Sequence, residues 1–494
     1  MLSLLLLTPL VGSLVLALLP QRFDAWIRRT AIVAAALALA QALWLLWKFD
    51  PAGDFQFFET HAWNPRLGSA FSLAVDGLAL SLVLLAAILF VAAFIAFRVP
   101  AGTARLYYLL MLALESAVLG VFMARDWSLF YVFWEMTLIP LFFLIERLGG
   151  PQRQRAALNF VLYTLGGSVF MLVALLLLYD AVAGHSFDMT VLAAGGGALA
   201  NEQQTLIFLG LFLGFAVKMG VFPLHGWMPL VYREAPAAVP LISSGVLLKM
   251  GAYGTLRAVE TLPGAAVALQ NSLSWLALVS LLYGAVLAWQ SRDLIAMATY
   301  ASVSHMAVVL LGAATLAPAG FSGAALQMLA HGLAAGALFL LIGLWHEHKA
   351  AATASTGDDP HVAHDGLVSH LPRLGSLLVL VLLLGLGLPG SFGFVAELHV
   401  LSAGFAGWGP RVVLVSIAVL IGAAWVLREV TRMTRMTSGS QVIAPASADL
   451  GRIDTAVIAV LIVLLVGGGV VPGGVLALVG GTSQRMAQVF VGLL

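Results

Sequence analysis

Long apolar runs separated by short polar segments repeat along the whole chain. Each run has about the length that an α-helix needs to cross a bilayer, and charged residues, Pro or Gly bound it. The pattern predicts an all-α polytopic membrane protein with about fourteen transmembrane helices. The runs fall at residues 2–20, 30–47, 76–97, 104–123, 127–145, 157–180, 204–234, 238–258, 273–290, 293–314, 321–345, 374–407, 411–428 and 453–476.

The first run, from Met1 to Pro20, resembles a signal peptide in length only. It lacks a positively charged start and a small-residue cleavage site, and further apolar runs follow it. We therefore interpret it as the first transmembrane helix.

Positive charge alternates from one loop to the next. Because Lys and Arg concentrate in cytoplasmic loops, the alternation supports fourteen spans and places both termini outside the cytoplasm. The basic loops hold Arg22, Arg28 and Arg29, then Arg98 and Arg105, then Arg147, Arg153 and Arg155, then Arg233, Arg292, Lys349 and Arg373, and finally Arg428, Arg432, Arg435 and Arg452. The intervening loops are neutral or hold Asp50, Asp54, Glu59, Asp180, Asp188 and Glu202.

Two spans are broken near a buried charge. Pro223 follows Lys218 in the run 204–234, whereas Pro389 precedes Glu397 in the run 374–407. Paired broken helices of opposite order are typical of inverted repeats with an ion site near the midplane.

The repeats divide the chain into four predicted segments. The first five-helix repeat covers 104–258, and the second, with its helices at 273–428, covers 259–430. Residues 1–103 hold three further helices, and residues 431–494 hold the last helix and a tail.

Composition agrees with this class and excludes others. The 494 residues are 61% hydrophobic and 10% charged, against about 25% charged in soluble domains. A net charge of +1 gives no reason to expect nucleic-acid binding. Because the chain has no cysteine, it ligates no iron–sulfur cluster through thiolates and forms no disulfide, so any redox chemistry belongs to another subunit.

The longest polar loop, residues 346–373, is rich in histidine. Metal binding is one interpretation, but a solvated linker is the preferred one. Its histidines are His346, His348, His361, His364 and His370.

Seven ionisable residues lie well inside the predicted spans. A charge at the bilayer centre costs about 2.5–3.5 kcal/mol on insertion scales, so such residues usually face a partner or a wet cavity and carry function. They are Glu115, Glu135, Lys218, Lys249, His305, His331 and Glu397. Arg257, Glu146 and Arg428 lie near span ends, where long side chains can reach water.

Acids, lysines and histidines at these positions suggest proton transfer. Glu135 and Lys218 on neighbouring helices are expected to act as a charge pair. His305 and His331 occupy consecutive helices between the lysines and Glu397, as a relay would require.

For each of these residues a structural role is the alternative. For Glu115, a role in helix packing and a role in proton transfer are equally consistent with the sequence. His225 and Glu234, at or beyond the break, are candidates for the place where protons enter, or simply loop charges.

Several motifs resemble the antiporter-like M subunit of respiratory complex I, the proton-pumping NADH:quinone oxidoreductase. They are YVFWEMTLIPLFFLI, FAVKMGVFPLHGWMP, ISSGVLLKMGAYGTLR, YASVSHM, QMLAHGLAAGALFLLIG and GLPGSFGFVAEL, and the similarity covers about residues 104–475.

The resemblance implies fourteen helices, two inverted repeats and a central hydrophilic axis. It further implies that Glu135, Lys218, Lys249, His305, His331 and Glu397 transfer protons, while flavin, iron–sulfur clusters and quinone are bound by partner subunits. Other antiporter-like subunits are the implied neighbours, and a bacterial inner membrane is the expected location.

Two sites depart from the family pattern. Leu230, Val231 and Tyr232 stand where an acid, Ala and His are usual, and Ile295 and Ala296 replace Lys-Arg. Related assemblies therefore stay open as a second hypothesis: a membrane-bound hydrogenase, a multisubunit cation/proton antiporter or a carbon-uptake complex. A structural membrane anchor is the third.

Overall fold

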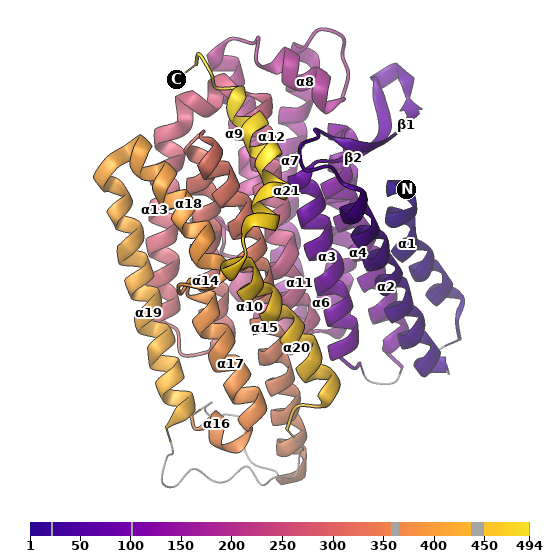
Figure 1. Ribbon diagram of the computed structural model, residues 1–494. Coiled ribbons are helices and arrows are strands. Elements are labelled where there is room, and N and C mark those ends of the chain that lie inside the picture. Colours follow the sequence, from indigo (N-terminus) through magenta and orange to yellow (C-terminus); the bar gives the residue numbers. More distant parts are fainter. Residues whose placement is uncertain (21–22, 100–101, 357–364, 436–448, 494) are drawn as a thin grey trace.

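The computed structural model describes residues 1–20, 23–99, 102–356, 365–435 and 449–493. Most helices run side by side along one direction and form a single bundle, and both ends of the chain lie at the same end of it (Figure 1). We call that end the upper end and the opposite one the lower end.

The helices alternate in direction, as a polytopic bundle requires. Their bounds are α1 Leu2–Leu18, α2 Asp24–Lys48, α3 Gly77–Ala96, α4 Ala104–Met123, α5 Trp127–Met136, α6 Leu138–Leu148, α7 Arg153–Ala181, α8 Met189–Gly196, α9 Asn201–Met219, α10 Met228–Glu234, α11 Ala238–Ile242, η3 Ser243–Leu247, α12 Leu248–Thr261, α13 Pro263–Gln290, α14 Leu294–Ala314, α15 Pro318–Thr356, α16 Leu367–His370, α17 Pro372–Gly385, α18 Phe392–Trp408, α19 Val413–Thr434, α20 Arg452–Val470 and α21 Gly473–Gln488.

Five crossings of the described residues are interrupted, one of them between α20 and α21 at Val471 and Pro472. Pro140 has no N–H to donate to the carbonyl of Met136, and α5 gives way to α6 at Thr137. Gly220, with a φ of 75°, ends α9. Gly387 and Gly390 also have positive φ values, and they separate α17 from α18.

The remaining interruption lies between α11 and α12, where the π-helical turn η3 intervenes. When the two halves of each interrupted crossing are counted together, the described helices make the predicted fourteen crossings. Ten helical stretches of the described residues are by themselves long and apolar enough to span a membrane.

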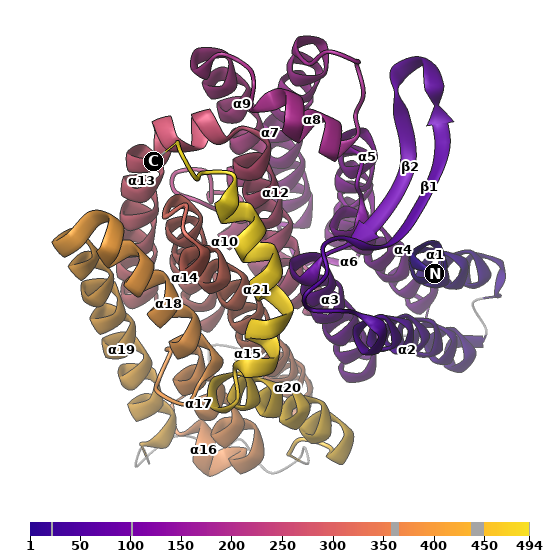
Figure 2. The same ribbon diagram turned by 45° about the horizontal axis from the view of Figure 1, so that its top comes forward.

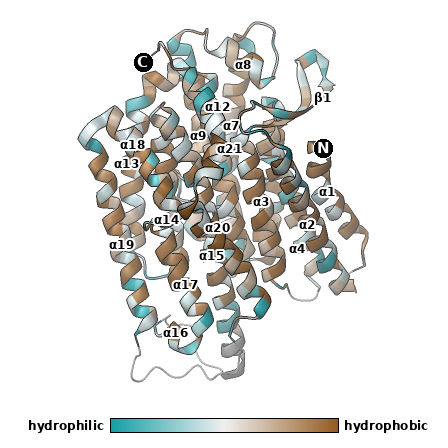
Figure 3. Cartoon of the chain, viewed as in Figure 1, coloured by the Kyte–Doolittle hydropathy of each residue, from teal (hydrophilic) through white to brown (hydrophobic). Residues whose placement is uncertain are grey.

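Polar residues gather at the two ends of the bundle, and apolar residues cover its flanks (Figure 3). Exposed Leu, Val, Phe and Trp side chains are frequent on α1, α2, α7 and α19. This distribution is typical of a surface that faces lipid.

The upper end holds elements that the apolar pattern did not reveal. Strands β1 Gln56–Asn64 and β2 Ser69–Val75 form an antiparallel hairpin that projects from the bundle (Figure 2). The predicted C-terminal tail contains a further helix, α21, which continues from α20 to the upper end (Figure 1). Helix α15 extends to Thr356, beyond the predicted end of its span at 345.

Close helix contacts bring the two lysine-bearing helices together. A Cβ atom on Gly251 of α12 would lie 2.4 Å from the carbonyl oxygen of Phe215 on α9. Only glycine allows this approach, and the backbones of the helices that carry Lys218 and Lys249 therefore touch.

Candidate functional site

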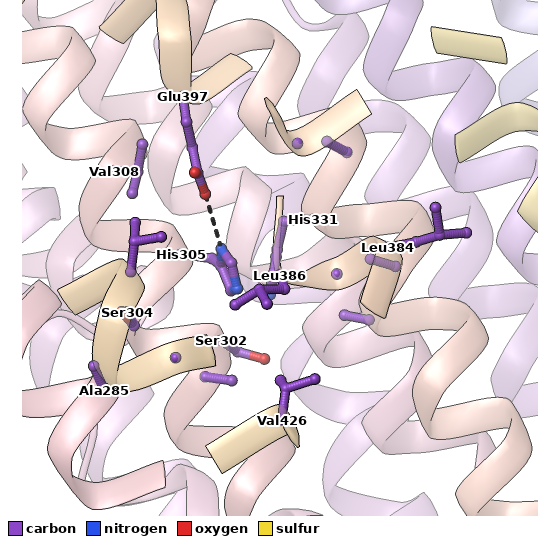
Figure 4. Close-up of a pocket in the computed structure, with 18 of the residues that line it drawn as sticks. Ala285, Ser302, Ser304, His305, Val308, His331, Leu384, Leu386, Glu397 and Val426 are labelled. Carbon is purple, nitrogen blue, oxygen red and sulfur yellow. Dashed lines mark ion pairs between the residues drawn. The ribbon is translucent and has the colours of Figure 1, made fainter. Parts of the chain in front are cut away.

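A row of polar side chains runs through the interior of the bundle from α12 to α18. Lys249 Nζ lies 2.6 Å from His331 Nδ1, and the ring of His331 stacks on that of His305 with centroids 5.4 Å apart. His305 Nδ1 is in turn 3.9 Å from Glu397 Oε1 (Figure 4). The structure thus brings four of the predicted residues, from α12, α15, α14 and α18, into one continuous series.

Lys249 is completely buried, and the π-helical turn before it supplies a second partner. Its ammonium donates to the backbone carbonyl oxygen of Ser244, which lies in that turn. The Ser244 and Ser302 hydroxyls, 2.8 Å apart, add a polar contact between η3 and α14. A π-turn interrupts the regular helical hydrogen bonds, and turns of this kind are frequent at functional sites.

The break between α17 and α18 makes room for the carboxylate of Glu397. A Cβ atom on Gly387 would lie 2.9 Å from Glu397 Oε2. A cavity of about 90 Å³ adjoins the carboxylate, and Ser302, His305 and His331 also line it. Such a space is large enough for water molecules that could link His305 to Glu397.

Gln327 is a member of this site that the sequence analysis missed. Its Nε2 lies 3.2 Å from His305 Nδ1. It precedes His331 by one helical turn on α15, so the i, i+4 spacing to a buried histidine was the available signal.

Lys218 and Glu135 lie at a second centre, on α9 and α5. The side chain of Lys218 is 3% exposed, and its Nζ donates to Thr137 Oγ1 at 3.1 Å. Trp134 and Phe160 place their rings 5.5 and 5.7 Å from the same ammonium. Glu135 Oε1 is buried without a hydrogen-bond partner. The hydrogen bond of the lysine is therefore made to a neutral hydroxyl, whereas the predicted acid interacts with it only electrostatically.

The two centres are separate within the described residues. Although α9 and α12 touch at Gly251, no hydrogen bond between described side chains joins Lys218 to Lys249. A proton that moved between them would need water or a side-chain movement.

The two candidates for proton access differ in setting. His225 is 7% exposed, its Nδ1 has no partner, and its ring lies against Tyr283 and Tyr300. Glu234 Oε2 instead accepts from the backbone N–H of Gln152 at 2.7 Å. Glu234 thus holds the α6–α7 loop in place, whereas His225 keeps a free ring nitrogen among the described groups.

Glu115 stands apart from both centres. It is fully buried in α4, and neither carboxylate oxygen has a hydrogen-bond partner in the described part of the chain. The structure does not bring it to the polar row.

Contrary to the prediction, the side chain of Arg257 does not reach toward water. Its side chain is 2% exposed, and its Nη2 pairs with Asp76 Oδ2 at 2.7 Å. Arg485 of α21 pairs with the same oxygen at 2.7 Å, and Glu260 contacts both arginines at 3.2 Å. The prediction failed because a sequence does not reveal a distant carboxylate, and Asp76 is 181 positions away.

Among the described residues, no three His, Asp or Glu side chains are grouped so that they could hold a metal ion. This includes His346, His348 and His370 of the polar loop, whereas His361 and His364 lie outside the described residues. The polar row therefore consists of ionisable and amide side chains, without a metal-binding group among the described residues.

Comparisons with known proteins agree with this geometry. Residues 124–422 match the family described as NADH:quinone oxidoreductase/Mrp antiporter, transmembrane. The chain is 39% identical over 404 residues to NAD(P)H-quinone oxidoreductase chain 4 2 of Thermosynechococcus vestitus. The aligned region covers 81% of this chain and 74% of the relative.

Solved structures share the whole architecture. A chain of respiratory complex I from Thermus thermophilus is 30% identical, with a TM-score of 0.88 over 99% of both chains. A chain of the Mrp complex from Dietzia sp. DQ12-45-1b is 21% identical, with a TM-score of 0.83 over 98% of this chain and 52% of that chain. At 21% identity, this second likeness concerns the fold alone.

Proposed function

Because this chain belongs to the NADH:quinone oxidoreductase/Mrp antiporter family of transmembrane proteins, we propose that it is a proton-translocating membrane subunit of a complex I-type NADH:quinone oxidoreductase. The relatives are named NAD(P)H-quinone oxidoreductase chain 4, and the 30% identical structure is a chain of respiratory complex I. The observation that carries the proposal is the series Lys249–His331–His305–Glu397 in the membrane interior.

Each member of the series has a distinct role in proton transfer. The Lys249 ammonium can pass a proton to His331 Nδ1 along the contact at 2.6 Å, which leaves a neutral amine and an imidazolium. The stacked ring of His305 lies between His331 and the carboxylate of Glu397. Glu397 accepts the proton at the end of the series, beside the cavity. Glu135 and Lys218 form the corresponding exchange site of the first repeat.

The chain supplies no redox centre of its own in this proposal. Flavin, iron–sulfur clusters and quinone belong to partner subunits, and neighbouring antiporter-like subunits contact its flanks. The upper end faces the periplasm of a bacterium and the lower end the cytoplasm, since the lower loops hold the basic residues. His225, near the break of α9, is the place where protons enter from the cytoplasm.

Purification of the tagged protein from native membranes tests the assembly. We expect flavin and iron–sulfur subunits to accompany it, and the preparation to reduce quinone with NADH. Recovery with only antiporter-like subunits, or with a soluble hydration partner, would instead assign the chain to a related assembly.

Lys218→Ala tests proton translocation. Removal of a proton-transfer group lowers rates by about 10²-fold or more, so NADH-driven acidification of membrane vesicles should fall to near background. The assembled complex should still be recovered in normal amounts. Unchanged pumping by the assembled variant would contradict the proposal and favour a structural anchor.

A further inference from the structure

The ammonium of Lys218 rests in a neutral holding site. Its contacts are the Thr137 hydroxyl at 3.1 Å and the faces of Trp134 and Phe160 at 5.5 and 5.7 Å. A hydroxyl acceptor and two aromatic rings can stabilise a buried cation without a carboxylate in direct contact. The nearby carboxylate of Glu135 interacts with the ammonium electrostatically but forms no hydrogen bond or ion pair with it, and one of its oxygens is buried without a partner among the described groups.

The helix break determines how Thr137 is oriented. Thr137 is fully buried between α5 and α6, and its hydroxyl donates to the carbonyl oxygen of Trp134 at 2.8 Å. The single hydroxyl proton is used in that bond, so the oxygen presents its lone pairs to Lys218. The break that places this threonine opposite the lysine follows from Pro140, one turn further on.

We propose that Thr137 is a positioning residue for Lys218, which holds the ammonium in a neutral resting site from which it moves to Glu135 during each proton transfer. The inference rests on the proposed function, because it assigns a step to the same lysine. Both acceptors are near the lysine, because Thr137 Oγ1 accepts from its ammonium and the Glu135 carboxylate interacts with it electrostatically.

A neutral resting site has a clear advantage over a permanent ion pair. A carboxylate in direct contact with a buried ammonium would hold it firmly, because separation of a buried pair costs several kcal/mol. A hydroxyl acceptor binds the cation less tightly, so a change of charge nearby is enough to move it. The lysine can then alternate between two acceptors.

Three variants test the role of the hydroxyl. Thr137→Val keeps the shape of the side chain and removes the acceptor, Thr137→Ser keeps the acceptor, and Thr255→Val is the matched control. Thr255 is also buried, and its hydroxyl donates to the carbonyl oxygen of Gly251 within its own helix. The ratio of vesicle acidification rate to quinone-reduction rate is measured in membranes with equal amounts of assembled complex.

We expect Thr137→Val to lower this ratio about tenfold, as loss of one hydrogen bond to a charged group would. Thr137→Ser and Thr255→Val should keep the ratio of the unaltered protein. Equal ratios for Thr137→Val and the unaltered protein, or an equally low ratio for Thr137→Ser, would overturn the proposal. If the complex does not assemble with Thr137→Val, Thr137→Ala takes its place. If the complex assembles with Thr137→Ser but with neither of these variants, Thr137 is needed for assembly and the proposal is also overturned.

The same set of variants includes Lys218→Ala, which separates this inference from the proposed function. Pumping that survives in Lys218→Ala argues against the function itself. Pumping that is lost in Lys218→Ala but retained in Thr137→Val argues only against the holding site.

Discussion

At the scale of single residues, burial alone does not separate functional from structural charges. Glu115 and Glu397 are both buried acids in apolar helices. Glu397 has His305 at 3.9 Å and a cavity beside it, whereas both carboxylate oxygens of Glu115 lack described partners. A proton path needs neighbours that accept the proton, and only Glu397 has them among the described groups.

This difference predicts opposite results for the two acids. Glu397→Gln should lower NADH-driven pumping by about 10²-fold or more, because an amide cannot exchange the proton. Glu115→Gln should pump at the normal rate, because no described residue uses its charge. Vesicle acidification compares the two variants, and a pumping defect in Glu115→Gln would show that Glu115 belongs to the path.

At the scale of elements, the helix breaks position the reactive groups. Thr137 lies in the α5–α6 break, Lys218 at the end of α9, and Glu397 just after the α17–α18 break. Lys249 follows the π-turn η3. An interrupted helix leaves backbone groups free and opens space at membrane depth, which an unbroken helix does not.

Two glycines of one break allow a matched test of this idea. Gly387 and Gly390 have φ values of 77° and 92°, so alanine at either position should cost about 1–2 kcal/mol of stability. Only at Gly387 would the new Cβ approach the Glu397 carboxylate, at 2.9 Å, while at Gly390 it would meet no atom within 4 Å.

We therefore expect both variants to lower the thermal unfolding temperature in detergent by similar amounts. Only Gly387→Ala should also lower the pumping rate per quinone reduced. Equal pumping ratios in the two variants would mean that the close approach of Gly387 to the carboxylate is unimportant.

At the scale of the whole molecule, a buried charge cluster joins distant parts of the chain at the upper end. Asp76 precedes α3 and pairs with Arg257 of α12 and Arg485 of α21. Burial would raise the pKa of the Asp76 carboxyl, but the two guanidinium groups and the backbone N–H of Ala79 hold that pKa well below its usual range. The cluster thus ties α21 to α12 and to the start of α3.

The cluster predicts a pH dependence of stability. A folded-state pKa below the unfolded value means that Asp76 contributes stability at neutral pH, and that this contribution decreases as pH falls below about 4. Asp76→Asn leaves two arginines without this partner and should cost about 3–5 kcal/mol at pH 7.

Thermal unfolding in detergent between pH 7 and pH 3 measures the effect. The difference in unfolding temperature between the unaltered protein and Asp76→Asn should be constant near neutral pH. It should become smaller below about pH 4. Asp54→Asn is the control, because Asp54 pairs with Arg485 but is 66% exposed and should matter little. A gap that is independent of pH would contradict the assigned role of Asp76.

The sequence by itself determined the class of protein, the crossings and most of the candidate site. Apolar length and basic loops suffice for this, because a bilayer imposes a fixed thickness and a charge asymmetry on any chain that crosses it. The buried lysines, histidines and acids were recognisable for the same reason, since their cost in an apolar setting demands a function or a partner.

Only the tertiary structure decided which of those residues meet. It placed Lys249, His331, His305 and Glu397 in one series and left Glu115 outside it. It also turned Lys218 toward Thr137 and paired Arg257 with Asp76. The last two contacts join residues 81 and 181 positions apart. All of these contacts depend on how helices pack side by side, which the periodicity of each helix does not specify.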